Sequence, residues 1–323
     1  MSATNWPQMW FHFFRGLYRQ LGVLGREIQG KRGRAVVIGV PLLMMGLFFV
    51  LPFVIILKIS FSEAELAQPP YTSLWAWAEG GYLTIKLNFS NYLLLWQDDL
   101  YLGAYLNSIK IAAISTLFAL LLGYPLAYGI ARTSKAWRLT LLMLIILPFW
   151  TSFLIRIYAW IGLLNNTGVI NNALLALGLI DQPLQMIRTD FAVYIGIVYC
   201  YLPFMVLPLV ATLVRMDQTL LEAAADLGCR PTTAFFKITL PLSMPGIAAG
   251  CLLVFIPAIG EFVIPDLLGG PDSVMIGRTL WTEFFTNNDW PLAASVAVAM
   301  LAFIVVPTLL FEKVQERQEP AQK

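Results

Sequence analysis

Six long apolar runs, separated by short polar segments, dominate the chain. A helix needs about 20 mostly apolar residues to cross the hydrocarbon core of a bilayer. The runs lack the alternation of apolar and polar residues that marks the strands of membrane barrels. The pattern therefore predicts six membrane-spanning helices. The predicted spans are residues 35–57, 111–130, 139–164, 191–214, 241–260 and 291–311.

The composition supports this prediction and excludes several other classes of protein. Hydrophobic residues make up 59% of the 323 residues and charged residues only 12%, compared with about 45–50% and about 25% in soluble domains. The net charge is only +2, which argues against a nucleic-acid partner. A single histidine, His12, and three widely separated cysteines provide neither a metal-ligand spacing nor a Ser–His pair. An integral-membrane enzyme is therefore disfavoured.

The basic residues predict how the spans are oriented. Lysine and arginine are enriched in loops on the cytoplasmic side of a membrane. Most of the 21 basic residues precede the first span, follow the last, or lie in the second and fourth loops. Both termini are therefore expected in the cytoplasm. The expected organisation is an interfacial segment at 1–34, with an amphipathic helix over 6–24 or else a disordered arm, a six-span domain at 35–311 and a tail at 312–323.

The cytoplasmic loop at 215–243 carries the most informative motif. Asp217 can cap a short helix over 218–227. Gly228 can end that helix in the left-handed conformation, and a second helix is expected over 231–240. Three consecutive alanines leave one side of the first helix smooth. A smooth, capped helix of this kind suits a groove on another protein.

This motif resembles the EAA–G–I–LP signature of the permease subunits of binding-protein-dependent ABC importers. The resemblance covers about residues 35–311 and implies an all-α integral membrane fold of the type I, MetI-like class. It implies that the EAA loop seats in a cleft of a separate cytoplasmic ATPase. The residues that the resemblance assigns to ATPase coupling are Glu222, Ala223, Ala224, Asp226, Gly228, Ile238, Leu240 and Pro241.

Four further stretches look like the putrescine and spermidine permeases of the polyamine branch. They lie at residues 123–127, 150–156, 260–265 and 268–272. The resemblance implies a bacterial inner-membrane complex with a second permease, two copies of an ATPase and an extracytoplasmic polyamine-binding protein. ATP and Mg²⁺ would bind the ATPase, and this chain would carry no cofactor.

Two groups of alternatives remain open at this point. The transported solute could be ferric iron or an oxyanion, although an acidic residue in the path argues against an oxyanion. The chain could also be a stand-alone channel or secondary carrier, neither of which would need the EAA loop.

An acidic residue in an apolar stretch gives the first candidate for the substrate path. Placing a charge near the middle of a bilayer costs about 2.5–3.5 kcal/mol on insertion scales, so Glu261 is expected to face a bundle interior or a watery path. The alternative is a structural ion pair with Arg156. Aromatic faces attract alkylammonium groups by about 0.5–2 kcal/mol, although packing is the simpler reading of any one ring. The remaining path candidates are Asp266, Tyr158, Trp160, Tyr199 and Tyr201.

Overall fold

The computed structural model describes residues 31–77 and 83–318. The chain forms two units, Met1–Ile59 and Ser60–Lys323. The interfacial helix expected over 6–24 lies outside the described residues. Within the described part of the chain, five helices are long and apolar enough to cross a membrane. The chain is therefore a polytopic helical membrane protein, as the apolar runs predicted.

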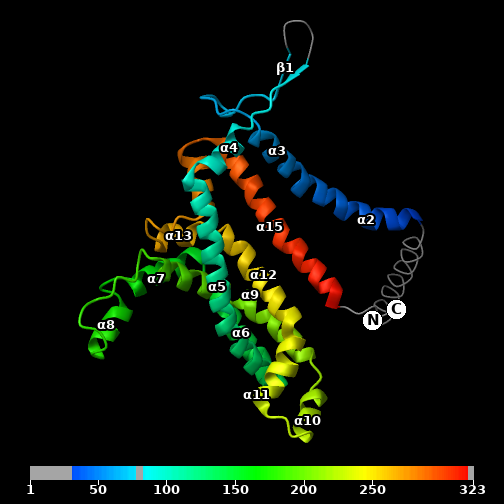
Figure 1. Cartoon of the computed structure of the whole chain (residues 1–323), viewed down its shortest axis with the longest axis vertical. Coiled ribbons are helices and arrows are strands. Elements are labelled where there is room, and N and C mark those ends of the chain that lie inside the picture. The colour runs from blue at the N-terminus through cyan, green and yellow to red at the C-terminus, as the bar shows by residue number, and fades with distance from the viewer. Residues whose placement is uncertain (1–30, 78–82, 319–323) are drawn as a thin grey trace, which may run out of the picture. The chain divides into compact units, whose positions relative to one another are not determined.

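In the first unit, the described residues form one long helix that covers the first predicted span (Figure 1). Over residues 36–56 its side chains are apolar and most of them are exposed, as expected for a helix whose surroundings are lipid or another protein. A π-helical turn ends at Val50, two residues before Pro52, which has no N–H for the regular ladder. The helix consists of α2 (Lys31–Met45), η1 (Gly46–Val50) and α3 (Leu51–Ser60).

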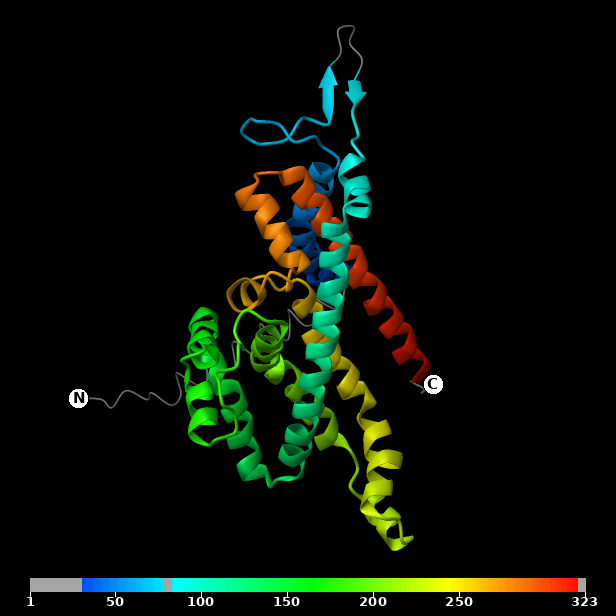
Figure 2. The ribbon, with the colours of Figure 1, turned by 60° about the vertical axis from the view of Figure 1, so that its left-hand side comes forward.

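Three long helices form the core of the second unit (Figures 1 and 2). Small residues let two of them approach closely: a Cβ atom placed on Gly250 would lie 2.7 Å from Met205 Sδ. A Cβ atom on Gly246 would lie 2.6 Å from Thr212 Oγ1. Close packing therefore depends on the glycines of this GxxxG pair. The three helices are α5 (Asp99–Arg132), α9 (Asp190–Arg215) and α12 (Leu240–Ile259).

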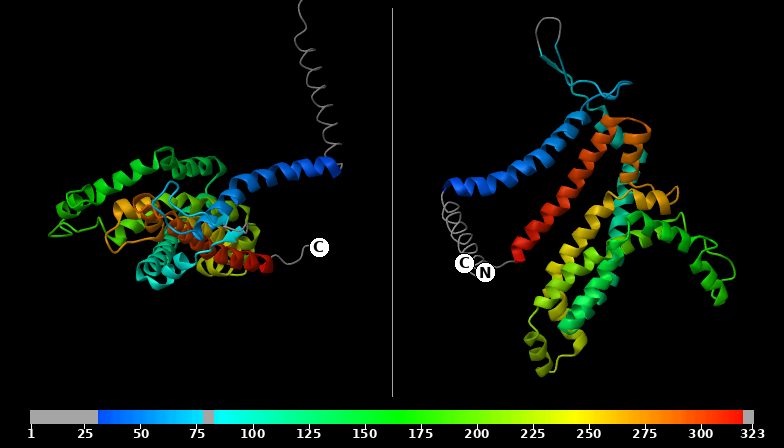
Figure 3. Two further views of the ribbon diagram at one scale, coloured as in Figure 1. Left: turned by 90° about the horizontal axis from the view of Figure 1, so that it is seen from above. Right: turned by 180° about the vertical axis from the view of Figure 1, so that it is seen from behind.

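A second group of elements surrounds the end of this core at which α5 begins. Tyr105 of α5 donates a hydrogen bond from its hydroxyl to the Val296 carbonyl, at 2.7 Å. The Ile276 amide donates to Ser108 Oγ at 2.8 Å. The last helix, which covers the sixth predicted span, runs beside α12 (Figure 3). These elements are α4 (Ser90–Gln97), α14 (Ile276–Trp281), η4 (Thr282–Thr286) and α15 (Trp290–Gln318).

The third span is not the single continuous helix that the apolar run at 139–164 predicted. The helix breaks after the 3-10 turn that contains Pro148, and Thr151 is extended. Proline disfavours a continuous helix because it lacks an N–H and its ring crowds the preceding turn. The broken segment consists of α6 (Lys135–Ile146), η2 (Leu147–Trp150) and α7 (Phe153–Leu164), and α8 (Val169–Ala176) follows it.

A small antiparallel hairpin adds to the all-α membrane domain. It pairs β1 (Trp75–Trp77) with β2 (Leu83–Ile85) in the segment before α4. Asn91 of α4 anchors this segment by donating hydrogen bonds to the Ser60 and Ser62 carbonyls, at 3.1 and 3.0 Å. The sequence did not predict the hairpin.

Candidate functional site

The EAA loop folds into a tight helical turn at the far end of the core helices. Asp217 accepts the Thr219 amide at 3.0 Å and so caps α10 (Thr219–Asp226). Gly228 ends this helix with a φ of 76°, and its amide donates to the Ala225 carbonyl at 2.8 Å. The predicted cap and the left-handed glycine are therefore both confirmed.

The second helix of the loop is not separate, and this part of the prediction is wrong. After α11 (Pro231–Ala234) the chain passes through a π-helical turn, η3 (Phe235–Thr239), directly into α12. The wider turn ends just before Pro241, which has no N–H to continue an ordinary ladder. The result is one apolar helix over Pro231–Ile259, so the loop is directly continuous with a core helix.

The loop is anchored to the bundle on one side and exposed on the other. Phe235 packs edge-on against Tyr124 and Tyr128 of α5, with ring centroids 5.7 and 5.9 Å apart. Arg132 at the end of α5 donates to Gln218 Oε1 at 2.6 Å.

Five of the eight residues assigned to ATPase coupling are exposed. Ala224 is buried and Ile238 and Leu240 are half-buried, whereas the others among the eight coupling candidates are exposed. Leu227 is 88% exposed beside them and Phe236 is 64% exposed. An exposed apolar surface of this kind fits a protein partner.

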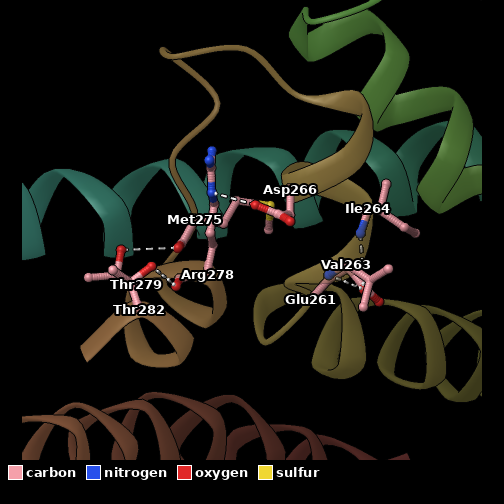
Figure 4. A network of polar contacts seen from close by, with 8 residues as sticks. All are labelled: Glu261, Val263, Ile264, Asp266, Met275, Arg278, Thr279 and Thr282. Carbon is pink, nitrogen blue, oxygen red and sulfur yellow. Dashed lines mark hydrogen bonds and ion pairs between the residues drawn. The ribbon is translucent and has the colours of Figure 1, made fainter. Parts of the chain in front are cut away.

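Glu261 occupies the junction between α12 and α13 (Val263–Leu268), where it is buried. Its Oε2 accepts a 2.5 Å hydrogen bond from the Tyr201 hydroxyl of α9. Its Oε1 accepts the Val263 amide at 3.1 Å and the Ile264 amide at 3.4 Å (Figure 4). The side chain therefore caps α13 and ties it to the core.

Arg156 is not the partner of Glu261 in this structure. The ion pairs among the described residues do not include one between these two side chains. The Arg156 guanidinium instead lies over the rings of Phe149 and Phe153, with its carbon 4.9 and 5.7 Å from their centroids. Its Nε and Nη1 are buried without a hydrogen-bond partner among the described residues. The structural ion pair considered for Glu261 is therefore absent here.

The other path candidates do not gather around Glu261. Asp266 forms an ion pair with Arg278 of α14, with 3.0 Å between Oδ1 and Nε (Figure 4). Trp160 and Tyr199 pack edge-on at 5.4 Å, and Tyr158 is 59% exposed. Of the four aromatic candidates, the hydrogen bonds place only Tyr201 directly at the buried carboxylate.

A second buried carboxylate, Glu283 of η4, was missed by the sequence analysis. Its Oε1 accepts the Tyr101 hydroxyl at 2.8 Å, and its Oε2 accepts the Asn287 amide at 2.8 Å. An acidic residue among the aromatic residues at 281–285 was a signal that could have identified it. Among its described residues, the second unit therefore holds two buried carboxylates, each bound to a tyrosine hydroxyl.

The fold and the exposed helical turn together define a polytopic membrane protein that is built to engage a partner. Residues 119–320 match the family described as binding-protein-dependent transport system inner membrane component. The chain belongs to this family.

Named relatives and solved structures agree with this assignment. The spermidine/putrescine transport system permease protein PotB of Haemophilus influenzae is 37% identical over 261 residues, 80% of this chain and 86% of that protein. The protein of the same name from Escherichia coli K12 is 41% identical over 240 residues, 74% and 87% of the two chains. The structure of a bacterial ABC transporter for alginate import superposes with a TM-score of 0.68 at 17% identity, covering 92% of this chain and 99% of that one. At that identity, the superposition supports the type I importer permease fold alone.

Proposed function

We propose that this chain is a permease subunit of an ATP-driven importer that moves putrescine or spermidine into the bacterial cytoplasm. The observation that carries the proposal is the identity of 37–41% to two spermidine/putrescine permeases over about three quarters of the chain or more. The chain lies in the inner membrane with both termini in the cytoplasm, as the distribution of basic residues predicts. The EAA loop then faces the cytoplasm and Glu261 lies towards the outer side.

The proposed complex contains several other chains. A second permease completes the transmembrane pathway, and an extracytoplasmic polyamine-binding protein delivers the substrate. Two copies of a cytoplasmic ATPase bind ATP and Mg²⁺, and this chain itself carries no cofactor. Movement of the ATPases presses on α10, and the continuous helix Pro231–Ile259 carries that movement into the core. Transport then proceeds by a switch between inward-facing and outward-facing states.

The buried acidic residues fit a cationic substrate. Glu261 receives three hydrogen bonds, all from neutral donors, so no protein cation among these partners competes with a substrate ammonium. We assign Glu261 and Tyr201 to the substrate path. The identity of 37–41% to two spermidine/putrescine permeases makes the alternatives less favoured. These alternatives are ferric iron or an oxyanion as the substrate, and a stand-alone channel or carrier as the class of protein.

An uptake assay tests the proposal. Cells that lack this chain and other polyamine importers are given labelled putrescine or labelled spermidine, with and without the restored chain. Restored uptake that the unlabelled form of the same amine inhibits is the expected result. Absence of restored uptake for both amines, while the chain is in the membrane and its ATPase co-purifies, would discard the polyamine assignment.

A further inference from the structure

A cavity of 830 Å³ lies in the second unit, between residues 64–70 and residues 287–290. Its volume is in the range of small-molecule sites, which is about 300–1,000 Å³. Glu65, Asp289 and Trp290 line it. In the proposed orientation both segments lie on the outer side of the membrane. We call this space the outer cavity.

The two carboxylates that line the outer cavity have no basic partner among the described residues. Neither Glu65 nor Asp289 forms an ion pair within the described part of the chain. Asp289 uses Oδ1 to accept the Leu292 amide at 3.0 Å, which caps α15. Its second carboxylate oxygen accepts no hydrogen bond from the residues that the structure describes. The cavity therefore presents negative charge beside an indole ring.

A continuous series of aromatic rings leads from the outer cavity towards Glu261. Successive ring centroids are 4.5, 4.0, 4.8, 5.0 and 6.2 Å apart. The series begins at the residue next to Glu261 and reaches the lining of the cavity at Trp290, beyond which lies Tyr71. We call it the aromatic chain. In order, its members are Phe262, Trp281, Phe285, Phe284, Trp290 and Tyr71.

The aromatic chain is not simply part of the buried core. Trp281 is 43% exposed and Phe285 is 55% exposed, although Trp281 stacks on Phe262 and lies tilted against Phe285. Exposed aromatic faces attract alkylammonium groups, and their edges accommodate the methylene segments between those groups. Acidic residues and aromatic rings in series match the alternating charge and hydrocarbon of a linear diamine or triamine.

From these observations, and resting on the proposed function, we infer that the outer cavity is an entry site for alkyl polyammonium ions. Glu65, Asp289 and Trp290 hold the substrate first. The aromatic chain then guides it towards Glu261. The site belongs to this permease and is separate from the substrate pocket of any binding protein.

A thiol-protection experiment tests the entry site directly. In the full complex in oriented membranes, with the three native cysteines replaced by alanine, Ala67→Cys places a thiol in the lining of the cavity. The rate of its reaction with a cationic aminoethyl methanethiosulfonate is measured with and without putrescine. We expect putrescine to slow the reaction by about two- to fivefold. Equimolar butylamine, which has one ammonium group, should slow it less.

Matched variants make the test specific. Gln182→Cys places an exposed thiol next to another acid, Asp181, outside the cavity and the aromatic chain, and putrescine should not slow its reaction. On the Ala67→Cys background, Trp290→Leu should abolish the protection. Trp96→Leu, at a residue 73% exposed on α4, should leave the protection intact. Equal rates with and without putrescine at Ala67→Cys would overturn the inference.

Failure of the inference is distinguishable from failure of the proposed function. Uptake of labelled putrescine and spermidine is measured in the same Ala67→Cys complex. Uptake without protection would overturn only the entry site. Absence of uptake for both amines would overturn the proposed function and the inference with it.

A second variant guards against loss of assembly in Trp290→Leu. Asp289→Asn removes the charge of the side chain but retains the cap of α15. It should also weaken the protection of the Ala67→Cys thiol by putrescine.

Discussion

Tyr201 and Glu261 are joined by a 2.5 Å hydrogen bond that links α9 to the start of α13. The second carboxylate oxygen of Glu261 receives two backbone amides. All three donors are neutral, so the buried carboxylate is held in place without an ion pair. A carboxylate held in this way can attract an ammonium group without first releasing a basic side chain.

Replacement of Glu261 by glutamine should weaken substrate attraction while the fold is retained. The glutamine carbonyl can still accept the amides that cap α13, but it carries no charge. We expect Glu261→Gln to raise the half-saturating amine concentration for uptake by about tenfold, the effect of about 1.4 kcal/mol. The measurement is the concentration dependence of labelled putrescine uptake, with the amount of purified complex determined in parallel.

Tyr201→Phe, at the other residue assigned to the path, separates the charge of Glu261 from one of its hydrogen bonds. It removes the hydroxyl but keeps the carboxylate, so the half-saturating concentration should change much less. Loss of the assembled complex in Glu261→Gln, rather than altered uptake, would show that Glu261 is structural.

A bulky residue at Gly228 should uncouple transport from ATP hydrolysis. Gly228 has a φ of 76°, and β-branched residues are strongly disfavoured in this conformation. We expect Gly228→Val to distort the end of α10, leave the chain in the membrane, and reduce uptake by at least about tenfold. Uptake and ATPase activity of the reconstituted complex are measured together.

Gly178→Val provides the control for backbone strain. Gly178 has a φ of 65°, and, like Gly228, it has open space where a Cβ would be. The two variants therefore carry similar conformational costs, but Gly178 lies outside the EAA loop. Equal uptake by both variants and the parent would contradict the coupling role of the loop.

The sequence predicted the helices better than it predicted their interruptions. The long apolar runs identified the spans because lipid demands apolar surface over a fixed length. The break near Pro148 was missed because the polar residues at it, Thr151 and Ser152, are uncharged and the flanking residues are apolar. The π-helical turn at Phe235–Thr239 was missed because a wider turn leaves no mark in the hydrophobic pattern.

The candidate site shows the same limit. Asp217 and Gly228 were predictable because caps and left-handed residues depend on neighbours in the sequence. Glu261 stood out as a charge in an apolar stretch, but its partner is Tyr201, sixty residues away. Such a pair depends on how α9 packs against α12, which the hydrophobic pattern does not specify.

Removal of the Tyr101 hydroxyl should destabilise the second unit. Tyr101 donates to the buried Glu283 carboxylate at 2.8 Å, and loss of one donor to a buried acceptor costs about 1–3 kcal/mol. We expect Tyr101→Phe to lower the thermal midpoint of the detergent-purified complex. Tyr158→Phe, at a residue 59% exposed, should leave it unchanged. Equal midpoints for the two variants would mean that the Tyr101–Glu283 bond contributes little.

A side chain at Gly250 should separate α9 from α12. A Cβ atom there would lie 2.7 Å from Met205 Sδ and 3.0 Å from the Met205 carbonyl oxygen. The methionine sulfur can move, but the carbonyl belongs to the backbone of α9 and cannot move without shifting the helix. Overpacking of this kind costs about 1–3 kcal/mol, so Gly250→Val should lower the thermal midpoint of the purified complex. Gly129→Val on α5, where a Cβ would contact nothing within 4 Å, controls for the change in helix propensity and should be neutral. Equal thermal midpoints for the Gly250→Val and Gly129→Val complexes would contradict the prediction. They would show that α9 and α12 can move apart without loss of stability.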